Sequence, residues 1–371
     1  MMRGDISRQT NAPIAAKSEL TEEIKRLALS LGFARVGVAQ ADSAALEHDR
    51  RRLLSWLEAG HHASMSYLAK SAHVRCDPAH ASMLPGVRTI VVLAAPYPRP
   101  RPAHGPARGC VAGYAQGRDY HDVLYKKVRK VSAFLRQRGY RSRCSVDSMP
   151  VLERAWARIA GLGFIGKNCC LIVPGFGSYV FLSTVLTNAE LRPDEPLKRD
   201  CGQCDVCLQH CPTGALLDGY LLDARKCISY LTGVCRESIP DDLKALIGDR
   251  LLGCDACQQY CPYNASLPAT QNTDCAFSDR IFADLFDAER ILRMDEQTFN
   301  ERSRGSALRK VGRERMARNA AIVLGNSGDR KFCDLLPEVG RVDPSALVRD
   351  AANWAARAIA DRKTPNRVSH L

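Results

Sequence analysis

Apolar positions in the first half of the chain follow two periods in turn. A repeat of three to four residues predicts helices at 18–31, 45–59 and 151–160, and a longer helix that follows residue 121 and ends at Gly139. Short apolar runs rich in β-branched residues predict strands at 33–39, 89–95, 141–146, 170–173 and 179–187. Helices and strands that alternate in this way predict an α/β domain.

The pattern changes after residue 262, where it becomes helical and basic. Residues 302–318 carry seven basic side chains against one acid, Glu314. Residues 318–324 align with residues 349–355 at a period of 31, which is typical of stacked helical pairs. The sequence therefore predicts a short helical repeat whose basic face could bind RNA. A solvated capping helix is the alternative.

Composition limits the class of protein. The 371 residues are 46% hydrophobic, enough for two or three domains of ~100–200 residues each. The formal charge of +13 favours a polyanionic partner, although basic surfaces are also common without one. Residues 1–17 are polar and unpatterned, which predicts a disordered arm. No stretch resembles a secretory leader or reaches the ~18 apolar residues of a membrane span, so we expect a cytoplasmic protein.

Eight of the sixteen cysteines are spaced as ligands. The first run is Cys201-x2-Cys204-x2-Cys207-x3-Cys211-Pro212, the spacing of a bacterial two-cluster ferredoxin. The second run is Cys254-x2-Cys257-x3-Cys261-Pro262, and Cys227 lies between the two. Two cubane clusters need eight thiolates, and this set supplies them.

In two-cluster ferredoxins the cysteine before proline binds the other cluster. We therefore assign one cluster to Cys201, Cys204, Cys207 and Cys261, and the other to Cys211, Cys227, Cys254 and Cys257. A zinc site would need two matched pairs of thiolates, and disulfides would need an oxidising compartment. The remaining cysteines follow no ligand spacing and are expected to be reduced thiols: Cys76, Cys110, Cys144, Cys169, Cys170, Cys235, Cys275 and Cys333.

Three further features could carry chemistry. Residues 161–168 form a glycine-rich stretch that matches no phosphate-binding fingerprint. Asp119-x-His121 resembles the start of a signature by which some proteins donate histidine to cobalamin, but Leu124 stands where that signature has glycine. Asp147 ends a predicted strand before a predicted helix, so it is either an active-site acid or the N-cap of that helix.

Taken in order, the motifs resemble epoxyqueuosine reductase from about residue 20 to residue 360. The resemblance rests on Gly117-Arg118-Asp119-Tyr120-His121, Val146-Asp147, Pro150-Val151-Leu152-Glu153-Arg154, the stretch 161–168, Cys227-Ile228-Ser229-Tyr230-Leu231-Thr232, Gly253-Cys254-Asp255, Cys261-Pro262-x-Asn264, Arg318-Asn319 and Leu324-Gly325-Asn326. The chain departs from the family pattern at Gly113, Phe164 and Cys169-Cys170.

The resemblance implies a fold and its partners. A nitroreductase-like α/β (α+β) cobalamin-binding reductase domain would span residues 18–195, a two-cluster ferredoxin domain residues 196–270, and a basic α-helical HEAT-like tRNA-binding domain residues 271–371. The cofactors would be two 4Fe-4S clusters and cobalamin, which cycles between cob(II)alamin and cob(I)alamin. The protein would act as a monomer on tRNA with a queuosine-type anticodon, away from membranes, with electrons from an external low-potential donor.

The resemblance also implies the site. Asp147 would protonate the departing epoxide oxygen, helped by a pKa raised through desolvation under the corrin. Cobalamin contacts are implied at Gly166, Lys167, Asn168, Gly177, Ser178, Ser229 and Asp255.

Two other classes remain open. A cobalamin-dependent reductase of the dehalogenase type would act on a small molecule, and it should lack the basic helical tail. A non-catalytic iron-sulfur electron carrier or RNA-binding adaptor would not need Asp147 together with the glycine-rich stretch. An absorption spectrum with cobalamin and a tRNA mobility shift separate these classes.

Overall fold

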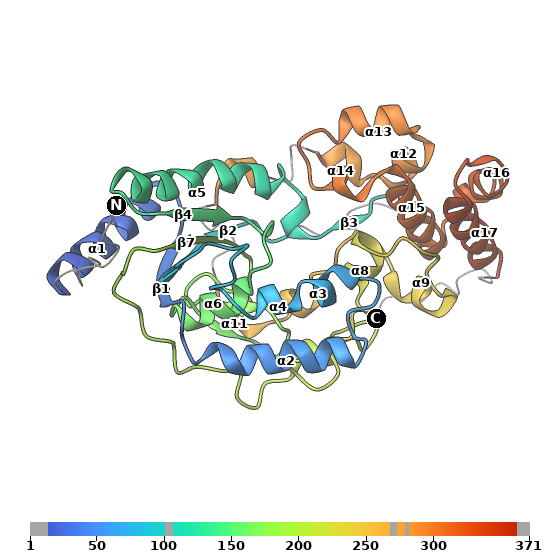
Figure 1. The fold of residues 1–371 in the computed structure, drawn as a ribbon. Coiled ribbons are helices and arrows are strands. Elements are labelled where there is room, and N and C mark those ends of the chain that lie inside the picture. Colours follow the sequence, from blue (N-terminus) through green and yellow to red (C-terminus); the bar gives the residue numbers. More distant parts are fainter. Residues whose placement is uncertain (1–13, 101–106, 268–272, 279–281, 362–371) are drawn as a thin grey trace, which may run out of the picture.

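The computed structural model describes residues 14–100, 107–267, 273–278 and 282–361. A half built on a β-sheet lies beside a half built from helices, and the cysteine-rich segment lies along both (Figure 1). The predicted arm at residues 1–17 falls almost wholly outside the described residues.

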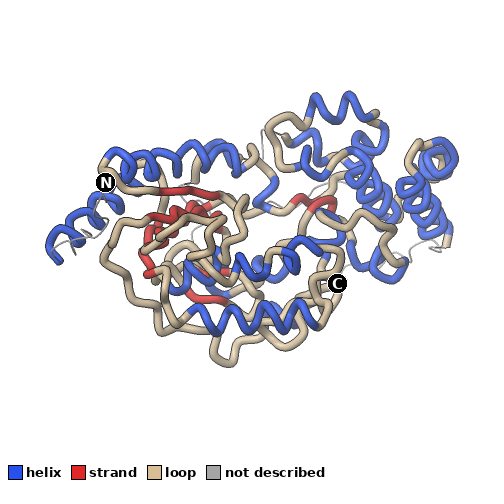
Figure 2. The backbone as a smooth tube through the Cα atoms, viewed as in Figure 1, coloured by secondary structure: helices blue, strands red, loops and turns tan. Residues whose placement is uncertain are grey.

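The sheet has four strands in the order β1-β2-β7-β4, and every neighbouring pair is antiparallel (Figure 2). Its strands are β1 (Arg35–Gln40), β2 (Thr89–Pro96), β4 (Ser142–Ser145) and β7 (Val180–Thr187). The long pairing of β2 with β7, from Thr89 opposite Thr187 to Pro96 opposite Val180, forms its centre. Antiparallel pairing throughout makes this half α+β, although its helices and strands alternate along the chain.

Helices cover both faces of the sheet. One face packs on α1 (Ile14–Ser30) and α5 (Tyr120–Gln137), and the other packs on α6 (Glu153–Ile159), against which α2 (Leu46–Glu58) lies. Two short helices follow α2: α3 (Ser66–Lys70) and α4 (Ala72–Arg75). The apolar stripe predicted for α5 is fully buried, which confirms that this helix is amphipathic.

The first helix begins earlier than predicted. It starts at Ile14 rather than at residue 18, so Ser18 and Thr21, residue types that often cap helices, lie inside it. The hydroxyl of Thr21 instead donates to the Lys17 carbonyl at 2.6 Å and accepts the backbone N–H of Arg192 at 2.9 Å. A side chain that anchors a distant loop resembles a cap in sequence, because both uses favour threonine.

The glycine-rich stretch is partly a hairpin rather than a loop. It contains β5 (Phe164–Ile165), which pairs with β6 (Leu171–Ile172). A Cβ atom at Gly163 would lie 2.2 Å from the Ile172 carbonyl oxygen, so only glycine allows the two segments to approach this closely.

The cysteine-rich segment consists of short elements joined by loops: α7 (Val206–Gln209), α8 (Ile228–Gly233), α9 (Asp241–Ile247), β8 (Arg250–Leu252), α10 (Ala256–Gln259) and α11 (Pro262–Ala265). Strand β8 pairs in parallel with β3 (Cys110–Val111), which follows the loop after β2 and leads to η1 (Gly113–Ala115). This pairing attaches the segment to the sheet-based half.

The tail is helical, as predicted. Its elements are η2 (Cys275–Phe277), η4 (Ala283–Phe286), α12 (Ala288–Arg293), α13 (Glu296–Arg302), α14 (Leu308–Val311), α15 (Arg313–Ser327), η5 (Arg330–Phe332), α16 (Leu335–Val342) and α17 (Ala346–Ala360). The two segments of the 31-residue repeat lie on α15 and α17, which pack together so closely that a Cβ at Gly325 would lie 2.6 Å from that of Ala355. One hydrophobic core joins these helices to α8, α9 and β8.

Arg318 and Asn319 connect the tail to the cysteine-rich segment. The Arg318 side chain is fully buried and donates to the carbonyls of Leu231, Cys235 and Glu237 at 2.6–2.9 Å. Asn319 donates to the carbonyls of Thr232 and Leu251. Burial lowers the pKa of the Arg318 guanidinium to about 10, so it stays charged at neutral pH.

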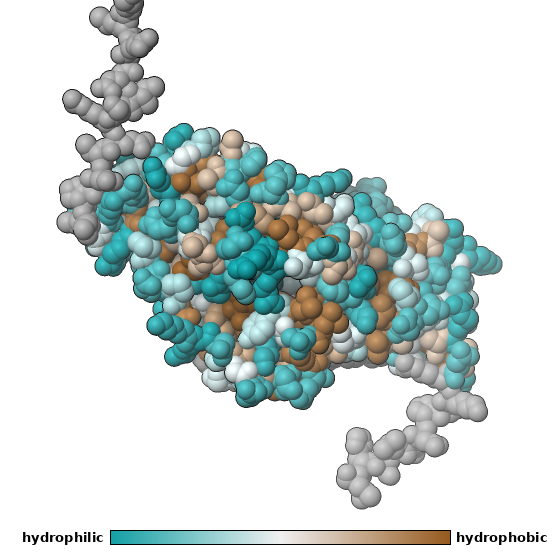
Figure 3. All heavy atoms as spheres, turned by 60° about the horizontal axis from the view of Figure 1, so that its bottom comes forward, coloured by the Kyte–Doolittle hydropathy of each residue, from teal (hydrophilic) through white to brown (hydrophobic). Residues whose placement is uncertain are grey.

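Hydrophilic residues cover most of the face shown in Figure 3 and separate its apolar patches. Among the described residues, no helix is both long enough and apolar enough to cross a membrane.

Loss of the Arg318 side chain should destabilise the protein strongly. Arg318→Leu would leave three buried carbonyl groups without their donors, and we expect the free energy of unfolding to fall by about 3–5 kcal/mol. Urea unfolding followed by circular dichroism measures the change. Arg309→Leu is the matched control, because Arg309 is exposed and has no side-chain partner among the described residues. Equal stability of the two variants would contradict the role of Arg318.

Candidate functional site

The eight spaced cysteines gather in two groups of four. Burial raises the pKa of the Cys207 thiol to about 11, and the next causes are the neighbouring thiolates of Cys201, Cys261 and Cys204. Burial likewise raises the pKa of Cys227 to about 11, with contributions from Cys254 and Cys211, and Cys257 lies close to Cys254 and Cys227. These neighbourhoods are the two ligand sets expected from the spacing.

The described residues suit a cluster better than a single ion. No three His, Cys, Asp or Glu side chains in the described ranges converge closely enough to share one metal ion. A cube instead distributes its four thiolates over four irons, which requires wider spacing. Backbone N–H groups point at two of the sulfurs, from Lys167 to Cys201 at 3.4 Å and from Ala215 to Cys211 at 3.3 Å. Such hydrogen bonds help to set cluster potentials.

A buried polar seam holds the second cysteine run against the sheet-based half. Asn264, three residues after Cys261, accepts the backbone N–H of Ser178 at 2.8 Å and donates to its hydroxyl at 2.9 Å. The Ser178 hydroxyl donates in turn to Gln258 at 2.9 Å. Gly177 precedes this serine with φ +68°, and a Cβ there would lie 1.9 Å from the Asn264 side-chain oxygen.

Asp255 and Asn168 extend the seam. The Asp255 carboxylate accepts the backbone N–H of Gly113 at 2.7 Å and the Gln258 amide at 2.9 Å. Burial raises the pKa of Asp255 to about 6. Asn168 donates to the Cys257 carbonyl at 3.1 Å.

Most of the expected cobalamin contacts are therefore engaged within the protein. Gly177, Ser178, Asn168 and Asp255 belong to the seam, and Lys167 donates its ammonium to the Gly202 carbonyl at 2.9 Å, beside the first cysteine run. Two others lie at the edge of this region. The backbone N–H of Ser229 points at the Cys227 sulfur, and a Cβ at Gly166 would lie 2.8 Å from the Asn168 side-chain oxygen.

Asp147 does not cap the following helix. Helix α6 begins at Glu153 with Leu152 at its N-cap position, so the structural alternative for Asp147 is wrong. Asp147 has a left-handed backbone, with φ +50°, and its side chain is 64% exposed. The Tyr120 hydroxyl donates to its carboxylate at 2.8 Å, while Glu153 accepts its backbone N–H at 3.1 Å.

The groups that hold Asp147 have strongly shifted pKa values. Burial, followed by the charge of Asp147, raises the pKa of Glu153 to about 8. The same two causes hold the pKa of Tyr120 well above its ordinary value, so this phenol keeps its proton and remains a donor to Asp147. The Tyr120 ring is also stacked on Phe181, with centroids 4.3 Å apart.

His121 connects Asp147 to the tail. Its Nδ1 lies 2.6 Å from the Asp119 carboxylate, and its Nε2 lies 3.9 Å from that of Asp147. Lys310 of α14 forms an ion pair with the other Asp119 oxygen at 2.8 Å. Burial raises the pKa of Asp119, but hydrogen bonds from His121 and Lys310 outweigh that effect and hold it well below its ordinary value.

Tyr114 lies where these groups meet. Burial raises the pKa of its phenol to about 12, and the charges that add to this shift are those of Asp255, Asp147 and Cys227. The candidate acid and a predicted ligand of the second cluster therefore both influence one partly buried side chain. This arrangement fits a cofactor that takes electrons on one side and meets its substrate on the other.

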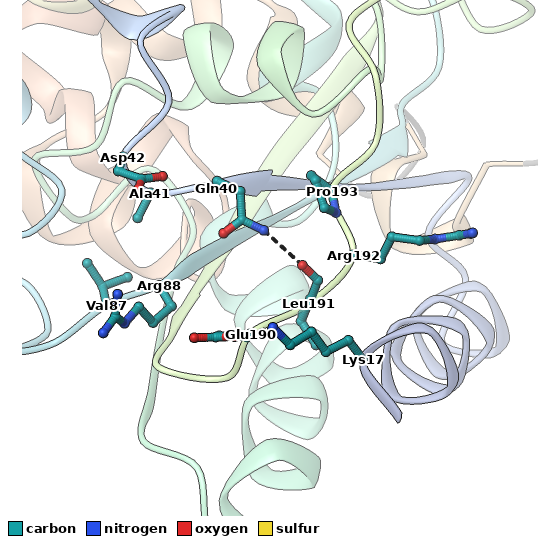
Figure 4. A pocket seen from close by; sticks show the side chains of 10 residues that line it. All are labelled: Lys17, Gln40, Ala41, Asp42, Val87, Arg88, Glu190, Leu191, Arg192 and Pro193. Carbon is teal, nitrogen blue, oxygen red and sulfur yellow. Dashed lines mark hydrogen bonds and ion pairs between the residues drawn. The ribbon is translucent and has the colours of Figure 1, made fainter. Parts of the chain in front are cut away.

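A separate pocket of 440 Å³ lies at the opposite end of the sheet (Figure 4). It is lined at the start of β2 by Val87 and Arg88, whereas Tyr97 at the far end of β2 is the residue near Asp255 and Cys170. The pocket is thus remote from the thiols and from Asp147.

The basic run of the tail is mostly structural. Five of its seven cations have partners within the protein: Arg302 with Asp284, Lys310 with Asp119, Arg313 with Asp343, Arg315 with the Gly233 carbonyl, and Arg318 with the carbonyls described above. Arg304 and Arg309 are exposed and have no side-chain partner among the described residues. Sequence alone could not distinguish cations that pair within the protein from cations that are free to bind a polyanion, because both roles require a long cationic side chain.

Sequence reasoning also missed Cys170, which it treated as an ordinary thiol. The Cys170 side chain forms a hydrogen bond with that of Cys257, a predicted ligand of the second cluster. Its only sequence signal was a departure from the family pattern beside the glycine-rich stretch.

Comparisons with known proteins agree with this geometry. Residues 75–148 match the family model described as epoxyqueuosine reductase QueG, DUF1730, and residues 200–264 match a 4Fe-4S double cluster binding domain. The curated epoxyqueuosine reductase of Xanthomonas campestris pv. campestris is 37% identical over 91% of this chain and 96% of its own length. That of Escherichia coli is 35% identical over 84% of this chain and 82% of its own length.

Two solved structures are also similar. An epoxyqueuosine reductase with an epoxyqueuosine-modified tRNA-Tyr stem loop matches with a TM-score of 0.84 and 32% identity, over 92% of this chain and 91% of that one. The Bacillus subtilis epoxyqueuosine reductase, described with its catalytic aspartate loop swung out of the active site, matches with a TM-score of 0.81 and 31% identity, over 92% and 90%.

Removal of one thiolate should affect one cluster. Anaerobically reconstituted protein should hold about eight iron and eight sulfide per chain, and Cys227→Ala should lose or damage only the cluster shared with Cys211, Cys254 and Cys257. Iron analysis and the EPR spectrum of the reduced protein measure this. Cys235→Ala is the control, because Cys235 is a nearby buried thiol outside both groups. Unchanged iron and EPR signal in Cys227→Ala would refute the assignment.

Proposed function

Because the chain belongs to the epoxyqueuosine reductase family, as relatives 35–37% identical over most of its length show, we propose that it reduces epoxyqueuosine to queuosine at the wobble position of tRNA anticodons, the last step of queuosine biosynthesis. The observation that carries this proposal is the exposed carboxylate of Asp147, held by the Tyr120 hydroxyl beside His121 in the half of the protein to which the cysteine-rich segment is attached. The reaction needs electrons and protons at one place, and this arrangement can supply both.

Electrons and protons have separate sources in this reaction. Conversion of the epoxide to an alkene consumes two electrons and two protons and releases the oxygen as water. The two 4Fe-4S clusters supply the electrons, and cobalamin, when bound, supplies a strongly reducing nucleophilic cobalt centre. No side chain can supply low-potential electrons, so the residues of the chain have to bind, orient and protonate.

We assign the proton donor to Asp147. Its exposed carboxylate, its left-handed backbone and its bond from Tyr120 are typical of a residue held for contact with a ligand rather than for packing. The Glu153 carboxyl group accepts the backbone N–H of Asp147 and so holds the loop that carries it. A catalytic aspartate loop that swings out of the site in the Bacillus subtilis relative supports this assignment.

The eight spaced cysteines would hold the clusters. Ser229 and Gly166, which border the Cys227 and Asn168 region, would contact cobalamin. Asn168, Gly177, Ser178 and Asp255 would shape its site through the seam, and Lys167 would do so through its bond to the Gly202 carbonyl. The Ser178 and Asp255 bonds leave these side chains few free hydrogen-bonding positions for a cofactor.

We further propose the finer architecture and setting. The sheet-based half would be nitroreductase-like and the tail HEAT-like, with boundaries near residues 195 and 270. The protein would work in the cytoplasm as a monomer that receives electrons from an external low-potential donor. The stem-loop complex of a relative supports tRNA as substrate. The dehalogenase-type alternative finds no support among the relatives above, all named epoxyqueuosine reductase.

Asp147→Asn tests the acid. Asparagine keeps the size and accepts the bond from Tyr120, but it cannot release a proton, so conversion should fall by about 10²–10⁴ while tRNA and cobalamin still bind. Nucleoside mass spectrometry of single-turnover reactions measures the conversion. Near-normal conversion would remove Asp147 from the mechanism.

The exposed cations of the tail should contribute to tRNA binding. Reversal of charge at Arg304 and Arg309 should weaken binding and reduce the log-log salt slope by about 0.7–0.9 for each phosphate that is no longer bound. Filter binding at several salt concentrations measures both. A double variant, Arg293→Glu with Lys331→Glu, changes the net charge equally on α12 and η5. If this control weakens binding as much, the effect is general electrostatics rather than a specific tRNA-binding surface.

A further inference from the structure

Four side chains form a continuous line from the tail to the candidate acid. Lys310 contacts Asp119 at 2.8 Å, Asp119 contacts His121 Nδ1 at 2.6 Å, and His121 Nε2 lies 3.9 Å from the Asp147 carboxylate. The catalytic assignment above uses only the last of these residues.

The backbone fixes this line on the tail side, around Asp119. Arg118 and Ser306 form an isolated antiparallel bridge, and the backbone N–H of Asp119 donates to the Gly305 carbonyl at 2.7 Å. Asp119 is also the N-cap of α5, where its carboxylate accepts the backbone N–H of His121 at 3.0 Å. The start of α5 is therefore attached to the tail, and rotation of the His121 side chain would break the contact of its Nδ1 with Asp119.

The bond to Asp119 determines which nitrogen of His121 faces the acid. A carboxylate can only accept, so Nδ1 carries a proton and donates it to Asp119. The Lys310 ammonium lies 2.9 Å from the same nitrogen, but the carboxylate is closer to it, at 2.6 Å. Nε2 is then the titrating nitrogen, and it is the one directed at Asp147. The Lys310 ammonium neutralises the charge of the Asp119 carboxylate, so the His121 imidazole contacts an ion pair that has no net charge.

The reaction needs a proton at neutral pH, which an aspartate side chain ordinarily does not hold. An imidazole titrates close to neutrality and holds a proton there much of the time. We propose that His121 is the proton store for Asp147, oriented by Asp119 and Lys310, and that binding of tRNA moves its proton to the acid. This inference rests on the proposed function.

The transfer is a single proton step. The Nε2–H bond of the imidazolium breaks, an O–H bond forms on the Asp147 carboxylate, and a charged pair becomes a neutral pair. Exclusion of water favours neutral forms over charged ones, so a substrate that covers Asp147 drives the proton in this direction. The present 3.9 Å separation closes with rotation of Asp147, whose side chain is exposed. After product release, solvent returns a proton to His121.

Other titratable groups face the pair. Tyr120 stacks on His121, with centroids 4.0 Å apart, and donates to Asp147, but its strongly raised pKa keeps its proton on the phenol. Glu153 holds a proton near neutrality, yet its contact is with the backbone N–H of Asp147 rather than with the carboxylate. Tyr114 is a further, partly buried phenol whose raised pKa keeps it protonated. His121 is thus the group placed to supply the carboxylate.

The pH dependence of single-turnover conversion tests the proposal. His121→Asn keeps a side-chain amide near Asp119 but has no titrating nitrogen. We expect the wild-type rate of conversion to stay constant up to near neutral pH. The rate of the variant should instead fall about tenfold for each pH unit from acidic pH upward. At pH 5 the two rates should be nearly equal, and at pH 7.5 the variant should be about 10–100-fold slower. Cluster content and tRNA affinity should be unchanged.

Lys310→Met should act in the opposite direction. Removal of a positive charge beside the imidazole favours its protonated form, so the plateau should extend to higher pH. Arg302→Met removes an exposed cation of the same tail whose side chain pairs, among the described residues, with Asp284 alone, and it should leave the profile in place. NMR titration of the His121 imidazole in protein without tRNA gives an independent readout, in which Asp147→Asn should change the midpoint because it removes a neighbouring charge.

The outcomes are distinct. If wild-type protein does not convert epoxyqueuosine, the proposed function fails. If it does, but His121→Asn is slowed equally at every pH or not at all, only the proton store is refuted. The proton-store proposal would also be refuted if the rate plateau were lost in Glu153→Gln and kept in His121→Asn. An NMR midpoint unaffected by Asp147→Asn would show that the two side chains do not interact.

Discussion

The buried guanidinium of Arg318 is the interaction on which the relative placement of the parts depends. Its planar fork binds the carbonyls of Leu231, Cys235 and Glu237, which lie at and just beyond the end of α8. Cys227, a predicted ligand of the second cluster, is the N-cap residue of α8. The same arginine belongs to α15, which follows α14 and its Lys310. The Arg318 side chain thus holds Cys227, a predicted cluster ligand, and Lys310, the tail residue of the line to Asp147, in fixed positions relative to each other.

The seam of Asn264, Ser178 and Gln258 performs the corresponding task on the other side of the clusters. Its members have their hydrogen bonds filled by one another, which a dry interface requires. The rate of electron transfer depends steeply on distance. The rigidity of the seam, which fixes the distances between cofactors, therefore matters more to this protein than the binding strength of the seam. Residues near a cofactor can therefore serve the reaction without touching it.

The sequence predicted local features well and long-range ones poorly. Cysteine spacing predicted two ligand groups from short local segments. A helical period located α5, which is buried on one face, and a continuous apolar run located β2, which is buried along its whole length. The N-cap alternative for Asp147 remained open because caps and loop acids use the same residue. The basic run was misjudged because burial of Arg313 and Arg318 depends on Asp343 and on carbonyls far along the chain. The ion pair between Lys310 and Asp119 joins distant parts of the sequence, and no local sequence pattern predicts such a contact.

The shared core of the cysteine-rich segment and the tail has a consequence for biosynthesis. Chains emerge from the ribosome with the N-terminus first, and α17, which completes this core with Trp354 and Ala355, is the last described helix to be made. The core that supports the site around Cys227 is therefore incomplete until α17 has been made and has packed against α15. Insertion of the second cluster would then come after the synthesis of α17.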